Sequence, residues 1–206
     1  MATLLTINKN TMTNQAQKTI GLLFGSFNPV HTGHLVIADH FVQYTDIECI
    51  WFVLSPQNPF KTNEEMLVQD KRLELLELAI EGNEHFEACD IELKMGTPSY
   101  TILTIKKLQA DFPDNRFILI IGSDNLDDFD KWKDYEELLT LVNIYVYPRP
   151  GHSGSRFLSH PAVKLVEAPH IDISSTQIRR AISEGKSPRY LLPDKVLQRI
   201  ITKNYF

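Results

Sequence analysis

Short apolar runs alternate with amphipathic stretches along most of the chain. The apolar runs are rich in β-branched and aromatic side chains, as buried strands are. They cover residues 19–26, 47–54, 86–93, 116–122, 143–147 and 163–166. Between them, apolar residues recur at helical spacing. This spacing predicts helices over residues 33–44, 65–81, 100–109, 135–141, 175–183 and 194–204.

The alternation of strands and helices predicts βαβ units, and therefore an α/β fold whose parallel sheet is covered on both faces. Ligands of such sheets bind beyond the carboxyl ends of the strands, so the loops that follow strands are the places to look for chemistry. Residues 1–18 are rich in Thr, Asn and Gln without a period, which predicts a flexible N-terminal tail. We expect residues 19–206 to form a single domain.

Composition narrows the classes of partner. The 206 residues carry a net charge of −5, whereas a broad nucleic-acid surface is usually basic, so we expect no nucleic-acid partner. No apolar run approaches the ~18 residues of a membrane span, and the first residues lack the pattern of a signal peptide. We therefore expect no membrane partner and a cytoplasmic protein, in which Cys49 and Cys89 are reduced core thiols.

The loop after the first predicted strand, GSFNPVHTGH, holds two histidines. Gly25 lets a ligand approach the backbone, because it has no Cβ. His31 and His34 are three residues apart at the start of a helix, where the free N–H groups and the dipole favour an anion. Two imidazoles there can donate hydrogen bonds to phosphate oxygens as negative charge builds up. A zinc site is the weaker alternative, since no third ligand is evident.

A second anion site is predicted near the end of the chain, in the stretch ISSTQIR. Ser174 or Ser175 is a good N-cap for the helix that starts here. The N-terminal amides and the hydroxyls of Ser175 and Thr176 offer several phosphate donors, and Arg179 lies one turn further on. By itself the stretch would be interpreted as an ordinary helix start. The anion-site interpretation is favoured because the histidine loop is present at the other end of the chain.

Loops in the middle of the chain add further candidates. The loop SPQNPFK follows the second predicted strand and ends in Lys61, which could reach a phosphate. The stretch SYT opens a predicted helix, where an anion is again favoured. The stretch IGSDN follows the most apolar predicted strand. Trp132 comes after this stretch and lies among charged residues, so a flat ring could stack on its indole. The candidates in these two stretches are Tyr100, Thr101, Gly122 and Asp124.

Together, HTGH and ISSTQIR resemble the paired signatures of nicotinate- and nicotinamide-nucleotide adenylyltransferases, whose HxGH motif is shared with class I aminoacyl-tRNA synthetases. The order SYT, IGSDN and F-x-x-W is similar to that of the bacterial nicotinate-nucleotide enzymes. Two positions depart from the family, since Phe24 stands where a second glycine is common and Asn28 where aspartate is. We expect Phe24 to narrow the approach to the backbone. The resemblance implies a Rossmann-like doubly wound parallel sheet with helices on both faces.

The resemblance implies a nucleotidyltransferase of NAD biosynthesis that moves the adenylyl group of ATP to nicotinate mononucleotide and releases pyrophosphate. It implies catalytic roles for His31, His34 and Arg179. It implies ATP contacts from Gly25, Ser26, Phe27, His34, Arg149, Ser175, Thr176 and Arg179. It implies pyridine-nucleotide contacts from Lys61, Tyr100, Thr101, Gly122, Asp124 and Trp132.

Mg²⁺ is expected to arrive with ATP and to bridge its phosphates, and no protein ligand for it is predicted because no carboxylate cage is evident. Several alternatives stay open. The acceptor could be nicotinamide mononucleotide or phosphopantetheine, since the preference for the acid form rests on the resemblance alone. The chain could also be a non-catalytic nucleotide-binding module on the same fold. The assembly state is open as well, with a homo-oligomer as one option.

Overall fold

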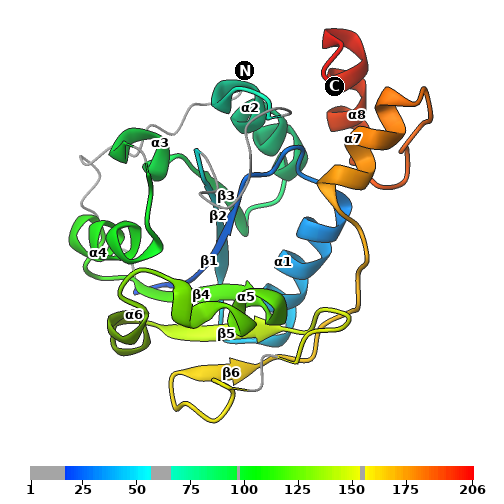
Figure 1. Ribbon diagram of the computed structural model, residues 1–206. Coiled ribbons are helices and arrows are strands. Elements are labelled where there is room, and N and C mark those ends of the chain that lie inside the picture. The colour runs from blue at the N-terminus through cyan, green and yellow to red at the C-terminus, as the bar shows by residue number, and fades with distance from the viewer. Residues whose placement is uncertain (1–16, 57–65, 97, 154–155) are drawn as a thin grey trace.

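The computed structural model describes residues 17–56, 66–96, 98–153 and 156–206 (Figure 1). Lys61, which the sequence analysis singles out, lies outside these ranges, and so does nearly all of the predicted N-terminal tail. Gln17 and Lys18, the described end of that tail, lead into the first strand without forming a helix or strand of their own.

Parallel strands form the central sheet of the described chain, in the order β3-β2-β1-β4-β5-β6. The strands are β1 (Thr19–Gly25), β2 (Cys49–Leu54), β3 (Phe86–Cys89), β4 (Arg116–Gly122), β5 (Asn143–Tyr147) and β6 (Val163–Leu165). This order is that of the Rossmann-like doubly wound sheet, so the predicted fold class is confirmed.

Helices cover both faces of this sheet (Figure 1). They are α1 (Thr32–Tyr44), α2 (Gln69–Ile80), α3 (Ile91–Met95), α4 (Thr101–Asp111), α5 (Ser123–Asp127), η1 (Phe129–Lys131), α6 (Tyr135–Leu141), α7 (Ser175–Ser183) and α8 (Asp194–Lys203). The chain runs outward from β1 through β2 to β3 and then crosses back to β4 on the other side of β1. The crevice beyond the carboxyl ends of β1 and β4 is therefore where this fold binds ligands.

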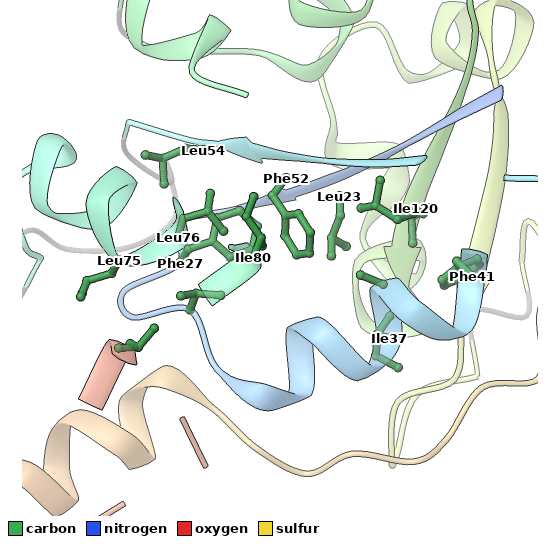
Figure 2. Close-up of a cluster of buried hydrophobic side chains, with 14 of the residues drawn as sticks. Leu23, Phe27, Ile37, Phe41, Phe52, Leu54, Leu75, Leu76, Ile80 and Ile120 are labelled. Carbon is green, nitrogen blue, oxygen red and sulfur yellow. The ribbon is translucent and has the colours of Figure 1, made fainter. Parts of the chain in front are cut away.

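Side chains alternate between the two faces of each strand, which divides the core into two clusters. In β4, Ile118 and Ile120 join one cluster, whereas Phe117, Leu119 and Ile121 join the other. The first cluster, part of which is drawn in Figure 2, packs the sheet against α1, α2 and α8. The second packs it against α4 and α6. Because both faces of the central strands are buried, β1, β2, β4 and β5 are mostly apolar, whereas the edge strands β3 and β6 contain Glu87 and Lys164.

The strand predicted over residues 86–93 is wrong in its second half. β3 ends at Cys89 and the short helix α3 follows it. Asp90 and Lys94 form an ion pair of 2.8 Å across one turn of this segment, which favours a helix where the apolar residues predict a strand. The helix expected over residues 65–81 begins only at Gln69. Helices α5 and η1 are not predicted from the sequence, because each is too short to show a period.

The described helices include none that is both long and apolar enough to cross a lipid bilayer. Cys49 and Cys89 are free thiols, and Cys89 is buried in the core as predicted, whereas Cys49 is half-buried against it. Burial raises the pKa of Cys49 to about 11 and that of Cys89 to about 12, so both thiols are protonated near neutral pH. Neither is therefore a candidate nucleophile.

Candidate active site

The two histidines of the first loop lie face to face at the start of α1. Their ring centroids are 3.6 Å apart and their planes are inclined by 22°. The backbone N–H of His31 donates a hydrogen bond of 3.2 Å to Nδ1 of His34. Because Nδ1 accepts this bond, the neutral ring of His34 carries its proton on Nε2. His34 can therefore donate to an anion without being charged.

His31 is the more deeply buried group and is neutral near pH 7. Only 4% of its surface is exposed. Burial, reinforced by the positive charge of Arg149, lowers the pKa of His31 to about 4. Within the described residues, its buried Nδ1 atom has no hydrogen-bond partner. Buried polar atoms are usually satisfied, so this ring is a candidate ligand contact.

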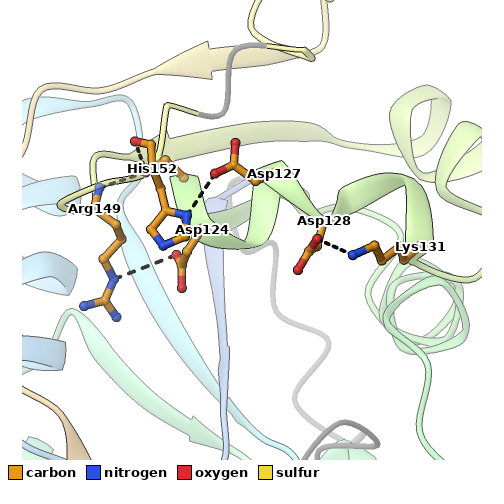
Figure 3. Close-up of polar contacts among 7 residues, drawn as sticks. Asp124, Asp127, Asp128, Lys131, Arg149 and His152 are labelled. Carbon is orange, nitrogen blue, oxygen red and sulfur yellow. Dashed lines mark hydrogen bonds and ion pairs between the residues drawn. The ribbon is translucent and has the colours of Figure 1, made fainter.

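Arg149 follows β5 and lines the same cavity as the two histidines. Its Nε lies 3.9 Å from Oδ1 of Asp124 (Figure 3), and its guanidinium lies 5.5 Å from the centre of the Tyr147 ring. The buried hydroxyl of Ser123 fixes the backbone here, since it accepts a hydrogen bond of 2.8 Å from the Arg149 N–H and donates one to the carbonyl of His152. The cation is thus held next to the imidazoles by both its backbone and its side chain.

The start of α7 is bound to the histidine loop. The hydroxyl of Ser175 donates a hydrogen bond of 2.9 Å to the carbonyl of Pro29, and Nη1 of Arg179 donates one of 2.9 Å to the carbonyl of Asn28. Ser174 is the N-cap of α7, because its hydroxyl oxygen accepts the backbone N–H three residues on. The structure therefore brings HTGH and ISSTQIR together, across a sequence separation of 146 residues between Ser175 and Pro29.

Two adjoining cavities open at this edge of the sheet, and Leu23 and Tyr147 line both of them. The first, which we call the histidine cavity, sets His31, His34 and Arg149 against apolar side chains. The second, which we call the aromatic cavity, has a volume of about 240 Å³. Its walls include the aromatic residues Phe24, Tyr100 and Trp132 and the charged residues Glu92, Lys131 and Lys133.

The predicted contact residues are divided among these cavities and their surroundings. The aromatic cavity is lined by Gly25, Ser26, Tyr100, Thr101, Gly122 and Trp132. The ring of Phe27 is buried beneath the loop and meets His34 edge-on at a centroid distance of 5.1 Å, so it supports that imidazole. Thr176 is exposed on the first turn of α7, and Asp124 faces Arg149 (Figure 3).

Arg72 is a buried charge that is not predicted from the sequence. Only 1% of it is exposed, and its guanidinium donates hydrogen bonds to the carbonyl oxygens of Leu67, Ser26, Ser55 and Pro56. It thereby ties α2 to the loops that follow β1 and β2. Arg72 lies on the buried side of α2, and a lone charge within a predicted apolar stripe is the signal that could reveal it.

Glu92 is a second buried charge. Unlike Arg72, it has no signal in the sequence, because it belongs to the segment that is predicted as strand. It is 2% exposed and lines the aromatic cavity. Its two carboxylate oxygens accept hydrogen bonds of 3.0 Å from the hydroxyl of Ser99 and 2.7 Å from that of Thr104. These bonds hold the stretch SYT, at the start of α4, against the cavity.

A family model described as cytidylyltransferase-like matches residues 22–181, so the chain belongs to the cytidylyltransferase-like family. Within that class its relatives are nicotinate-nucleotide adenylyltransferases, and the chain belongs with them. A protein of Cytophaga hutchinsonii named "Probable nicotinate-nucleotide adenylyltransferase" is 44% identical over 187 residues, which are 91% of this chain and 97% of that protein. One of the same name from Azobacteroides pseudotrichonymphae is 46% identical over 183 residues, 88% of this chain and 96% of the relative.

Solved structures with the same fold come from more distant proteins. The nicotinic acid mononucleotide adenylyltransferase of Plasmodium falciparum complexed with NaAD superimposes with a TM-score of 0.77 at 20% sequence identity. The match covers 91% of this chain and 97% of that one. At this identity the likeness establishes the architecture, in agreement with the strand order.

Proposed function

We propose that this chain transfers the adenylyl group of ATP to nicotinate mononucleotide, giving deamido-NAD and pyrophosphate. A phosphate oxygen of nicotinate mononucleotide attacks the α-phosphorus of ATP. The bond from that phosphorus to the oxygen that bridges to the β-phosphorus breaks, and pyrophosphate leaves with the electron pair. Such a transfer needs positioning and charge stabilisation more than a protein nucleophile.

One observation carries the proposal: a stacked His31–His34 pair faces a cavity that Arg149 also lines, at the switch point of the sheet. His34 would donate from Nε2 to an ATP phosphate oxygen, and neutral His31 would donate from one ring nitrogen. Arg149 would add a positive charge to the same phosphates. Donors already held in place stabilise developing charge better than water, because they need no reorganisation.

The aromatic cavity would hold the pyridine nucleotide. Tyr100 and Trp132 offer ring faces for a flat base, and Thr101 lies at the N-terminus of α4, where a phosphate is favoured. The two cavities share Leu23 and Tyr147, so their occupants would meet at the reacting phosphorus. Ser175, Thr176 and Arg179 would contact the triphosphate, because the start of α7 is bound to the histidine loop. Residues 19–206 would form one domain around the site.

Mg²⁺ is proposed to enter with ATP and to reduce the negative charge of its phosphates. Within the described residues, no group of three or more His, Cys, Asp or Glu side chains could hold a metal ion. Oδ1 of Asp124 lies 3.9 Å from Nε of Arg149. The donor set therefore fits an ion that is carried by the phosphates and by water rather than by a protein cage.

The test measures pyrophosphate release from Mg-ATP with nicotinate mononucleotide, nicotinamide mononucleotide and phosphopantetheine offered separately. We expect turnover with the nicotinate form, a loss of at least about 100-fold in His34→Ala, and little change in His85→Ala, which removes an exposed imidazole. Turnover with another acceptor alone would keep the chemistry and change the substrate. ATP binding without any pyrophosphate release would leave a nucleotide-binding module.

A further inference from the structure

We propose that Lys133 selects the acid form of the pyridine nucleotide, by pairing its ammonium with the carboxylate of the nicotinate ring. This inference rests on the proposed function and deepens it. Nicotinate and nicotinamide have nearly the same shape, so a cavity distinguishes them mainly by charge. A residue that reads this charge is therefore a specificity-determining residue.

The position of Lys133 carries the argument. Lys133 lines the aromatic cavity directly after Trp132, and its Nζ lies 4.4 Å from the centre of the Tyr100 ring in the same wall. Within the described residues, no ion pair involves Lys133. Its charge is thus held at the cavity by an aromatic face rather than by an acid.

The other lysine of this wall is already paired. Nζ of Lys131 lies 2.6 Å from a carboxylate oxygen of Asp128 (Figure 3). A substrate carboxylate would have to compete with Asp128 for Lys131, whereas for Lys133 it would replace only water and an aromatic contact. Of the two cations, Lys133 is therefore the better partner for an incoming anion.

The cavity also contains a negative charge that makes a cation necessary. Glu92 is buried in the same wall, where the hydroxyls of Ser99 and Thr104 donate to it. A second carboxylate that enters the cavity is repelled by Glu92, while a neutral amide is not. Without a cation, this cavity would favour nicotinamide, so Lys133 reverses the preference that Glu92 alone would create.

The test compares kcat/KM for nicotinate and nicotinamide mononucleotide in wild type and Lys133→Gln. We expect the variant to lose about tenfold in kcat/KM with the nicotinate form and to keep its value with the nicotinamide form, as for a charge-assisted contact at a partly exposed site. Lys133→Arg keeps the charge and should keep most of the preference. Lys195→Gln removes an equal charge from α8, where Lys195 pairs with Glu81, and should leave the ratio unchanged.

Three outcomes would overturn the proposal. An equal loss with both nucleotides would mean that Lys133 contacts the phosphate or ribose that they share. Unchanged kcat/KM for both nucleotides would mean that Lys133 contacts neither the carboxylate nor the amide of the ring. A changed ratio in Lys131→Gln but not in Lys133→Gln would move the role to Lys131. If wild type turns over neither nucleotide, the proposed function fails, and calorimetric binding of the two mononucleotides to wild type and Lys133→Gln still decides the role of Lys133.

Discussion

Nη1 of Arg179 donates a hydrogen bond of 2.9 Å to the carbonyl oxygen of Asn28, which joins α7 to the histidine loop. Asn28 is itself buried, and its side-chain oxygen accepts the N–H of Leu67. The loop is therefore held from two sides shortly before His31. A change in Arg179 should be felt at the imidazoles as well as at any phosphate that the guanidinium contacts.

We expect Arg179→Ala to lower kcat/KM by about 100-fold, because the variant loses a fixed cation and loosens the loop. Its free energy of unfolding should fall by about 2 kcal/mol, the order of magnitude of a charge-assisted hydrogen bond such as that to Asn28. Arg180→Ala is the matched control, since its side chain is 79% exposed and pairs with Glu184 on the same helix. Equal activity of the two variants in a pyrophosphate assay would refute the role of Arg179.

Arg72 should matter first for stability. Arg72→Met leaves buried carbonyls without a donor, at about 1 to 3 kcal/mol for each unsatisfied group, and local relaxation reduces the sum. We expect a loss of about 3 kcal/mol in the free energy of unfolding, or roughly 10 °C in Tm. Lys71→Met is the control, because Lys71 is exposed and its Nζ lies 4.7 Å from the centre of the Tyr205 ring rather than on buried carbonyls. Thermal unfolding that is the same for both variants would contradict this account.

His31 should make the stability depend on pH. Its pKa is about 4 in the folded protein against an ordinary value of 6.5, so between these values the unfolded chain binds a proton that the folded chain excludes. The free energy of unfolding should therefore fall by about 3 kcal/mol as the pH decreases from 6.5 to 4, with no contribution above that window. Denaturant titrations of wild type and His31→Gln across this range check the sign. A wild-type slope that persists in the variant would assign the effect to other groups.

The sheet and the loops that carry chemistry could be predicted from the sequence because their signals are local. Both faces of the central strands are buried, so β1, β2, β4 and β5 are mostly apolar runs. The motifs HTGH and ISSTQIR indicate helix starts that are suited to anions. Between Phe86 and Met95 the local signal is ambiguous. Apolar residues there fit a strand or a short helix equally well, and the Asp90–Lys94 ion pair across one turn favours α3.

Other parts of the site depend on contacts between distant segments. Arg72 binds backbone carbonyls, which carry no mark in the sequence, so its partners could not be inferred. The lowered pKa of His31 depends on burial and on Arg149, which follows a different strand. The placement of Lys133 over Tyr100 likewise joins two loops of the sheet edge. These relationships appear only when the chain is folded.

Gly33 offers the sharpest test of how closely the histidine cavity is packed. A Cβ at this position would lie 3.0 Å from Nδ1 of His31 and 3.0 Å from a methyl carbon of Ile171, and both residues line the cavity. In an unconstrained helix, glycine to alanine adds about 0.5 to 1 kcal/mol of stability. We expect Gly33→Ala to gain none of this and to lose about tenfold or more in kcat/KM, because the His31 ring must shift. Gly33→Ala combined with Ile171→Ala gives the new methyl group room and should recover part of the loss. If Gly33→Ala alone is both more stable and fully active, the His31 ring can accommodate the new methyl group, and the position of this ring does not determine kcat/KM.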